Sequence, residues 1–326
     1  MPFSIMNGSY ECRMLGNTYE EDLSEHVCSL GIDPSCATAL STAAWTELAA
    51  TEELHFRNFA VTAVATGGID SNGIHPRDPS SYYEENGNYE LLSPGTINIF
   101  LFINQPLTDA AMARALMLCS EAKATTVSQL LLGSCYSEEI ATGSGTDGTV
   151  VASSLHGNSA LTDASGHSKL GELIGKSVKS AVKQALLNQT AASGHRQFQL
   201  SVRLSRYKIT PETLWDFYTE HLTVFEEFKV ALTSPSSLKQ RFFAHNHTSI
   251  LILCVSLYLH LIDQFLWKLI MDQKALWEGK RLLFYGLHWQ QGQFLEKAYP
   301  AEAWKEPELL EFSLREQLMH LLLLYL

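Results

Sequence analysis

The alternation of hydrophobic and polar positions predicts two strands and two long helices in the first part of the chain. Residues 96–103, TINIFLFI, are mostly β-branched or aromatic, which is typical of a strand. Residues 59–65, FAVTAVA, predict a second strand. Apolar residues at helical spacing predict one helix over 110–132, which Thr108 can cap, and another over 169–189. A sheet with helices packed against it is therefore expected.

A further helix is predicted over residues 34–54. Asp33 can cap its first turn, and Pro34 suits the first helical position, where a backbone N–H has no helical partner. Alanine, leucine and tryptophan residues gather on one side of this segment. We therefore expect a helix just before the strand at 59–65.

The last part of the chain has the pattern of a helical region. Helix-like segments cover residues 211–232, 238–274 and 308–326. The longest apolar run, 250–262, is shorter than the roughly 20 residues that cross a bilayer. It therefore predicts a buried helix and no membrane span.

Together these elements predict an α/β fold, in which a mixed sheet with flanking helices is followed by a helical C-terminal region. The composition changes after Asn188, which places a boundary near residue 195. The expected domains are a core over 1–195 and a helical extension over 196–326. The strand order stays open, because hydrophobic patterns indicate the type of an element better than its neighbours.

Charge and cysteine content narrow the function classes. The formal net charge is −12, which argues against a nucleic-acid partner because such a partner requires a basic surface. The same charge suits a neutral or cationic small molecule. The six cysteines form no C-x-x-C pair, so we expect free thiols in a reducing, cytoplasmic setting. The oligomeric state stays open.

The segment 141–148, ATGSGTDG, combines three glycines with a single carboxylate, Asp147. Glycine lets backbone N–H groups turn toward a ligand, and consecutive free N–H groups form an anion-binding nest. Strand formers follow at 149–151, so we expect a loop that leads into a buried strand. The glycines also spell G-x-G-x-x-G, but a dinucleotide site needs a strand before this motif and a helix after it, and neither is predicted.

Four blocks, spread over about residues 30–190, carry a family resemblance by their sequence and their order. They are AVTAVATGGID, GTINIFLFINQPLTDAAMARALMLCSEAK, ATGSGTDGTVVAS and HSKLGELIGKSV. The chain resembles the adenosylcobinamide amidohydrolase family in these blocks. The core over 1–195 is accordingly interpreted as amidohydrolase-like.

The resemblance implies hydrolysis of the amide that joins aminopropanol to the corrin ring of adenosylcobinamide. The products would be adenosylcobyric acid and 1-aminopropan-2-ol, in the salvage of incomplete corrinoids. The corrinoid would be the substrate, and no cofactor is implied. The alternative is a non-catalytic corrinoid-binding protein associated with uptake, which would bind the same molecule without releasing aminopropanol.

Amide hydrolysis needs a nucleophile, a base, an acid for the leaving amine and donors for the oxyanion. Asp147 is the first candidate for a base that activates or positions water, although an aspartate in such a loop can equally cap the turn. His167 can protonate the leaving amine, or it can be an exposed histidine at a helix start. Glu172 is the third catalytic candidate. All three follow from the residue types and their placement alone.

The same loop offers nucleophiles and substrate contacts. Ser144 and Thr146 are possible nucleophiles, but a hydroxyl needs a positioned base and the chain has no G-x-S-x-G elbow, so activated water is favoured. The backbone N–H groups of Gly143, Gly145 and Gly148 are candidate donors to the oxyanion or to a peripheral amide of the corrin ring. The loop is therefore predicted to contact the substrate.

Four polar residues outside the loop are further candidates for substrate binding. Asn98 and Asn104 can meet the amides of the corrin ring, or they can be ordinary asparagines of a strand edge and a turn. Glu121 and Lys123 can bind substrate, or they can belong to a solvated helix face.

No metal site is predicted. The twelve histidines are scattered and no H-E-x-x-H motif occurs, while the close pair His245 and His247 is typical of a turn. The corrinoid-binding pattern D-x-H-x-x-G is also absent from the sequence. A cobalt-ligating histidine is therefore not expected.

Overall fold

The computed structural model describes residues 18–80, 96–157, 159–227, 230, 232–270, 279 and 314–326. The chain divides into two compact units, Met1–Ser193 and Gly194–Leu326. Residues 271–274 and 308–313 of the two last predicted helices, and Cys12 among the six cysteines, lie outside the described residues.

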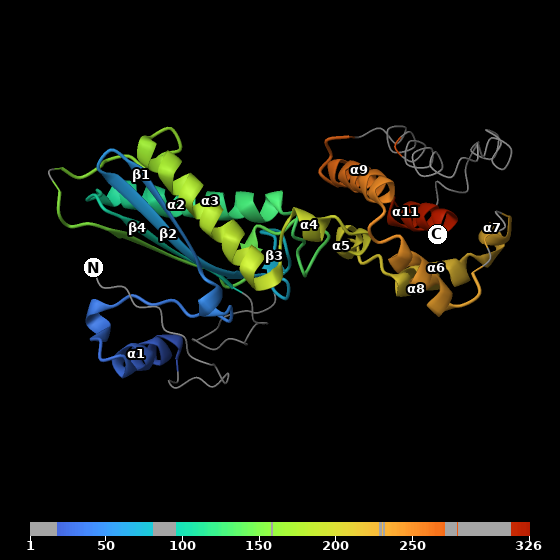
Figure 1. The fold of residues 1–326 in the computed structure, drawn as a ribbon, viewed down its shortest axis with the longest axis horizontal. Coiled ribbons are helices and arrows are strands. Elements are labelled where there is room, and N and C mark those ends of the chain that lie inside the picture. The colour runs from blue at the N-terminus through green and yellow to red at the C-terminus, as the bar shows by residue number, and fades with distance from the viewer. Residues whose placement is uncertain are drawn as a thin grey trace. The chain divides into compact units, whose positions relative to one another are not determined.

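The first unit contains a four-stranded mixed sheet (Figure 1). Its strands are β1 (Ala50–Phe56), β2 (Phe59–Gly68), β4 (Thr96–Ile103) and β6 (Gly148–Ser153), in the order β1-β2-β4-β6. β2 pairs antiparallel with both β1 and β4, whereas β4 and β6 are parallel. The predicted mixed sheet is confirmed.

Two long helices pack on each other and on this sheet (Figure 1), α2 (Asp109–Gln129) and α3 (Lys169–Thr190). Alternate residues of β4, among them Ile97, Ile99 and Leu101, are fully buried. They form one core with the inward-facing residues of both helices, because alternate side chains of a strand point to the same face of the sheet. Both helices begin and end close to the predicted limits.

Side-chain caps fix the starts of these helices. Thr108 Oγ1 accepts a hydrogen bond from Ala111 N at 3.3 Å, and Ser168 Oγ accepts one from Gly171 N at 2.9 Å. A Cβ at Gly171 would lie 1.9 Å from the carbonyl oxygen of Ser165, so only glycine fits this turn of α3. Gly175, one turn later, has nothing within 4 Å of the same position.

The helix predicted over 34–54 is wrong. Asp33 does cap a turn, accepting a hydrogen bond from Ser35 N at 2.9 Å, but the turn is a 3-10 helix, η1, of three residues only, Pro34–Cys36. After a second such turn, η2 (Thr46–Leu48), the chain enters β1. Pairing with β2 across a tight turn, in which Arg57 has φ 54°, overrides the helical tendency of this segment.

The loop 141–148 leads into a strand, as predicted, but that strand is not buried. β6 lies at the edge of the sheet, and all six of its residues are partly exposed. Just before it, β5 (Gly143–Ser144) pairs with β3 (Gly73–Ile74) in a separate two-stranded sheet. Because a strand and not a helix follows the loop, the dinucleotide context is absent here.

Ahead of the sheet, a short helix α1 (Tyr19–Ser29) begins at the cap residue Thr18. The sequence pattern did not predict it, because this segment is polar. Its hydroxyl cap, in which Thr18 Oγ1 accepts from Glu21 N at 3.2 Å, and its acidic first turn are nevertheless typical of a helix start.

The second unit is helical in its described parts, as predicted. The helices are α4 (Gly194–Gln197), α5 (Leu200–Ser205), α6 (Pro211–Glu220), α7 (Leu222–Glu227), α8 (Pro235–Ala244), α9 (Ser249–Leu266) and α11 (Leu314–Tyr325). The single helices predicted over 211–232 and 238–274 are each interrupted, the second at the turn that carries His245 and His247.

α9 is long and apolar enough to cross a membrane by length and composition alone, and 44% of its most apolar window is buried. One face, with Leu251 and Val255, packs into the core of the second unit, whereas Leu257 on another face is 72% exposed. Near its end the buried Asp263 accepts hydrogen bonds from Arg206 Nη2 at 2.7 Å and Tyr207 OH at 2.5 Å. The prediction of a buried helix is therefore confirmed for one face of α9 only.

Candidate functional site

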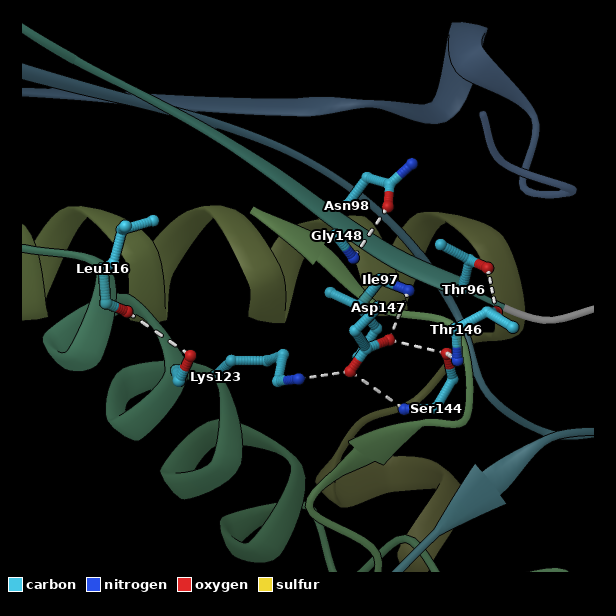
Figure 2. A network of polar contacts seen from close by, with 10 residues as sticks. Thr96, Ile97, Asn98, Leu116, Lys123, Ser144, Thr146, Asp147 and Gly148 are labelled. Carbon is cyan, nitrogen blue, oxygen red and sulfur yellow. Dashed lines mark hydrogen bonds and ion pairs between the residues drawn. The ribbon is translucent and has the colours of Figure 1, made fainter. Parts of the chain in front are cut away.

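The loop between β5 and β6 places the side chain of Asp147 among four donors (Figure 2). Its Oδ1 accepts from Ile97 N at 2.8 Å and from Ser144 Oγ at 2.6 Å. Its Oδ2 accepts from Ser144 N at 3.0 Å and from Lys123 Nζ, which also forms an ion pair with it. We call the side chains of Asp147, Ser144 and Lys123, with Ile97 N, the Asp147 network.

Three elements of the first unit bring this network together. Ile97 lies at the start of β4, Lys123 lies in the second half of α2, and the loop supplies Ser144 and Asp147. Only 10% of the Asp147 side chain and 17% of the Lys123 side chain are exposed. An ion pair so well shielded from water is stronger than one on the surface, and losing one partner leaves the other charge buried.

Further polar contacts hold the ends of the loop. Asn98 Oδ1 accepts from Gly148 N at 3.1 Å, and Asn98 Nδ2 donates to the carbonyl of Ser41 at 2.6 Å. The hydroxyls of Thr96 and Thr146 lie 2.5 Å apart (Figure 2). Asn98 thus joins the first residue of β6 to the segment before β1, and the structure gives it an internal partner on each side of its amide.

Two of the three loop glycines leave room for polar side chains. A Cβ at Gly143 would lie 2.1 Å from Asp147 Oδ2 and 2.7 Å from Lys123 Nζ. A Cβ at Gly148 would lie 2.8 Å from Asn98 Oδ1. Gly143 is therefore a position where a larger residue would displace the ion pair, which is a reason for glycine other than a ligand nest.

The loop N–H groups were expected to be donors to substrate, and the structure engages four of them inside the protein. Ser144 N bonds Asp147, Gly145 N bonds the carbonyl of Asn72 at 3.2 Å, and Thr146 N bonds Ser144 Oγ at 3.3 Å. Gly148 N bonds Asn98, as described above. Because these four N–H groups already have partners within the protein, they do not form an open oxyanion nest. The Lys123 ammonium group, which is paired with Asp147, carries three N–H groups and so has further hydrogen bonds to offer.

The four donors also restrict what Asp147 can do as a base. A carboxylate has about four lone-pair sites, and here each meets a donor. Backbone N–H groups do not give up their protons, so the hydroxyl of Ser144 is the neutral donor from which Asp147 can take one. The sequence pattern favoured activated water over Ser144 as the nucleophile, because it showed no positioned base for the serine. The structure places the carboxylate oxygen Oδ1 of Asp147 2.6 Å from Ser144 Oγ.

His167, Glu172 and Asn104 lie at the other end of the sheet. The Asp147 network is at the N-terminal ends of the parallel strands β4 and β6, whereas α3 begins beyond their C-terminal ends, where Lys169 Nζ lies 4.7 Å above the ring of Phe56 in the β1–β2 hairpin. The six residues of β6 span about 20 Å. The structure therefore does not bring these three residues to Asp147.

The local contacts at that end indicate structural roles. Glu172 is paired with Lys169 and with Lys176, the latter at 2.7 Å, and these lysine hydrogen bonds lower the pKa of Glu172 to about 2. Such a carboxylate stays ionised at neutral pH and has no proton to give a leaving amine. His167 is exposed in the turn before α3, and Asn104 closes the hairpin by accepting from Ala60 N at 2.8 Å.

The two charged candidates on α2, Glu121 and Lys123, lie in different surroundings. Lys123 points to Asp147, as Figure 2 shows, while Glu121 is exposed. Residues two apart on a helix do not share a face, so the pair could not both line one site. Sequence reasoning also missed Asn72, which is 1% exposed and accepts from the hydroxyl of Tyr136 at 2.9 Å while its backbone carbonyl holds Gly145 N.

Within the described part of the chain, no group of three or more histidine, cysteine, aspartate or glutamate residues could hold a metal ion. The described cysteines are free thiols: Cys28, Cys36, Cys119, Cys135 and Cys254. Burial raises the pKa of the Cys119 thiol to about 12, so it stays protonated and unreactive in the core. The fold and the site thus define an α/β protein with a lysine–carboxylate–serine network, in which the loop supplies the carboxylate and the serine and α2 supplies the lysine.

Comparison with known proteins identifies its family. The model of the adenosylcobinamide amidohydrolase family matches residues 4–194, and the chain belongs to this family. An uncharacterized protein of Methanocaldococcus jannaschii is 34% identical over 184 residues, which cover 53% of this chain and 71% of that relative. No solved structure matches the chain. The family match includes the whole Asp147 network and ends one residue after the first compact unit.

Proposed function

We propose that this protein hydrolyses the amide between aminopropanol and the corrin ring of adenosylcobinamide. The products are adenosylcobyric acid and 1-aminopropan-2-ol, and the reaction returns incomplete corrinoids to use in the cell. The corrinoid is the substrate, no cofactor takes part, and the protein works in the cytoplasm. Membership of the amidohydrolase family supports the reaction class.

The Asp147 network is the observation that carries this proposal. It joins a hydroxyl and a carboxylate of the loop to a cation of α2, and all three residues lie within the family match. These are the groups that amide hydrolysis uses for attack, proton transfer and stabilisation of the oxyanion. The surface ion pairs of α3, by contrast, combine only charges, with no nucleophile between them.

The test is to incubate the purified protein with adenosylcobinamide and to measure both products by mass spectrometry. Adenosylcobyric acid and 1-aminopropan-2-ol should appear in equal amounts. Binding of adenosylcobinamide without release of aminopropanol would instead favour a corrinoid-binding protein associated with uptake. The same incubation with complete cobalamins then defines how much of the lower ligand the site accepts.

A further inference from the structure

The geometry points to Ser144 as the nucleophile of this reaction, with Asp147 as its base. The inference rests on the proposed function and goes beyond it, because it assigns a covalent intermediate on Ser144 where direct attack by water would leave none. It depends on the short hydrogen bond between Ser144 Oγ and Asp147 Oδ1, 2.6 Å, together with the ion pair on the other carboxylate oxygen.

The hydrogen bonds orient the serine hydroxyl. Ser144 Oγ donates its proton to Asp147 Oδ1 and accepts from Thr146 N at 3.3 Å, so one of its lone pairs remains for attack. Lys123 and Ile97 N hold the carboxylate against rotation. A nucleophile, its base and a group that orients the base are the three parts of an activated hydroxyl.

Acylation follows from this arrangement. Ser144 Oγ attacks the amide carbon, and its proton passes to Asp147. The negative charge on the former carbonyl oxygen is met by the Lys123 ammonium group. The C–N bond then breaks, its electron pair stays on nitrogen, and Asp147 returns the proton to that nitrogen. 1-Aminopropan-2-ol leaves, and the adenosylcobyric acid is held as an ester of Ser144.

Deacylation repeats these steps with water. Once the amine has left and the Ser144 proton is gone, one lone-pair site of Asp147 is open to a water proton. Water attacks the ester carbon, its proton passes to Asp147, the bond to Ser144 Oγ breaks, and Oγ recovers the proton. One amide and one water thus give one acid and one amine.

The first measurement is the turnover of Ser144→Ala with adenosylcobinamide. Removing a nucleophile should lower kcat by more than about 10³-fold, while the protein should remain folded and corrinoid binding should stay near wild type. Ser177→Ala is the matched control, since Ser177 is a fully buried serine whose hydroxyl donates to Ile174 O of its own helix. A Ser144→Ala protein with more than a tenth of wild-type kcat would overturn the assignment.

The second measurement separates a nucleophile from a scaffold and needs no variant that might misfold. Isotopically labelled 1-aminopropan-2-ol is added during hydrolysis. An ester on Ser144 can be attacked by this amine, so label should enter the remaining adenosylcobinamide, and should not enter when adenosylcobyric acid replaces the substrate. Hydrolysis at a normal rate without label entry, at saturating amine, would assign attack to water. If the wild type releases no aminopropanol at all, the proposed function itself is what fails.

Discussion

Two carboxylate–lysine clusters lie at opposite ends of the same sheet, around Asp147 and around Glu172. The partners of Glu172 are three and four residues away on its own helix, and the cluster is open to solvent. The partners of Asp147 come from a strand, a helix and its own loop, and its side chain is 10% exposed. Both clusters pair a carboxylate with lysine, two lysines at Glu172 and one at Asp147, but they differ in burial and in the separation of the partners along the chain.

This difference shows why Asp147 is the better candidate for chemistry. A local pair on a helix surface is worth a few tenths of a kcal/mol and is screened by salt. A buried network assembled from distant segments is costly to form and is kept in place by the whole fold. It holds a serine and a carboxylate in a fixed geometry, which is what catalysis requires.

The largest expected difference between the clusters is in stability. Asp147→Ala leaves the Lys123 ammonium buried without its partner, which should lower the free energy of unfolding by about 3–5 kcal/mol. Glu172→Ala should change it very little. Urea unfolding of both variants measures this, and the double variant Asp147→Ala with Lys123→Met should regain part of the loss. Equal effects of the two single variants would contradict the contrast.

A smaller effect is expected from filling the space beside the ion pair. Gly143→Ala would place a Cβ 2.1 Å from Asp147 Oδ2, so the network must shift, at a cost of about 1–3 kcal/mol. Gly175→Ala is the matched control, because nothing lies within 4 Å of its Cβ position and alanine favours helix by up to about 1 kcal/mol. Melting temperatures should move in opposite directions. A fall for both variants would mean that the loss is not specific to the network.

The smallest expected effect is the pH dependence contributed by Glu172. Its pKa is lowered to about 2 in the folded protein, from an ordinary value near 4.5. A depressed pKa stabilises the folded state above the unfolded value, and this contribution is lost as the pH falls toward 2. The difference in melting temperature between wild type and Glu172→Gln should therefore be small at pH 7 and shrink below about pH 4.5. High salt should reduce it at neutral pH. A difference that grows on acidification would contradict this assignment.

The sequence was sufficient where the pattern was strong and local. Thr96–Ile103 was predicted with the bounds of β4, and α3 was predicted to within one residue at its end. β1 was missed because Ala50–Phe56 forms a strand through its pairing with β2, and the residues of this segment do not indicate that pairing by themselves. Likewise, the composition of β6 predicted a buried strand. Its exposure follows from its position at the edge of the sheet, which depends on the strand order and not on composition.

The candidate site shows the same limit. Asp147, Ser144 and Lys123 were all selected from the sequence, but no pattern could tell that Lys123 and not Glu121 faces the loop. His167 and Glu172 were selected with Asp147 for their residue types and their placement at the start of a helix, whereas in space the length of β6 separates them from Asp147. Asn72 was missed because its role depends on the fold of a distant turn.

The most direct test of the account compares aminopropanol release from adenosylcobinamide by Asp147→Asn and by Glu172→Gln. Each substitution keeps the shape of a carboxylate and removes its charge and basicity. We expect Asp147→Asn to lower kcat by about 10²–10⁴-fold, the usual worth of a general base, and Glu172→Gln to stay within several-fold of wild type. If a folded Asp147→Asn protein turns over at the wild-type rate, or if Glu172→Gln is the variant that loses activity, the active site does not lie at Asp147.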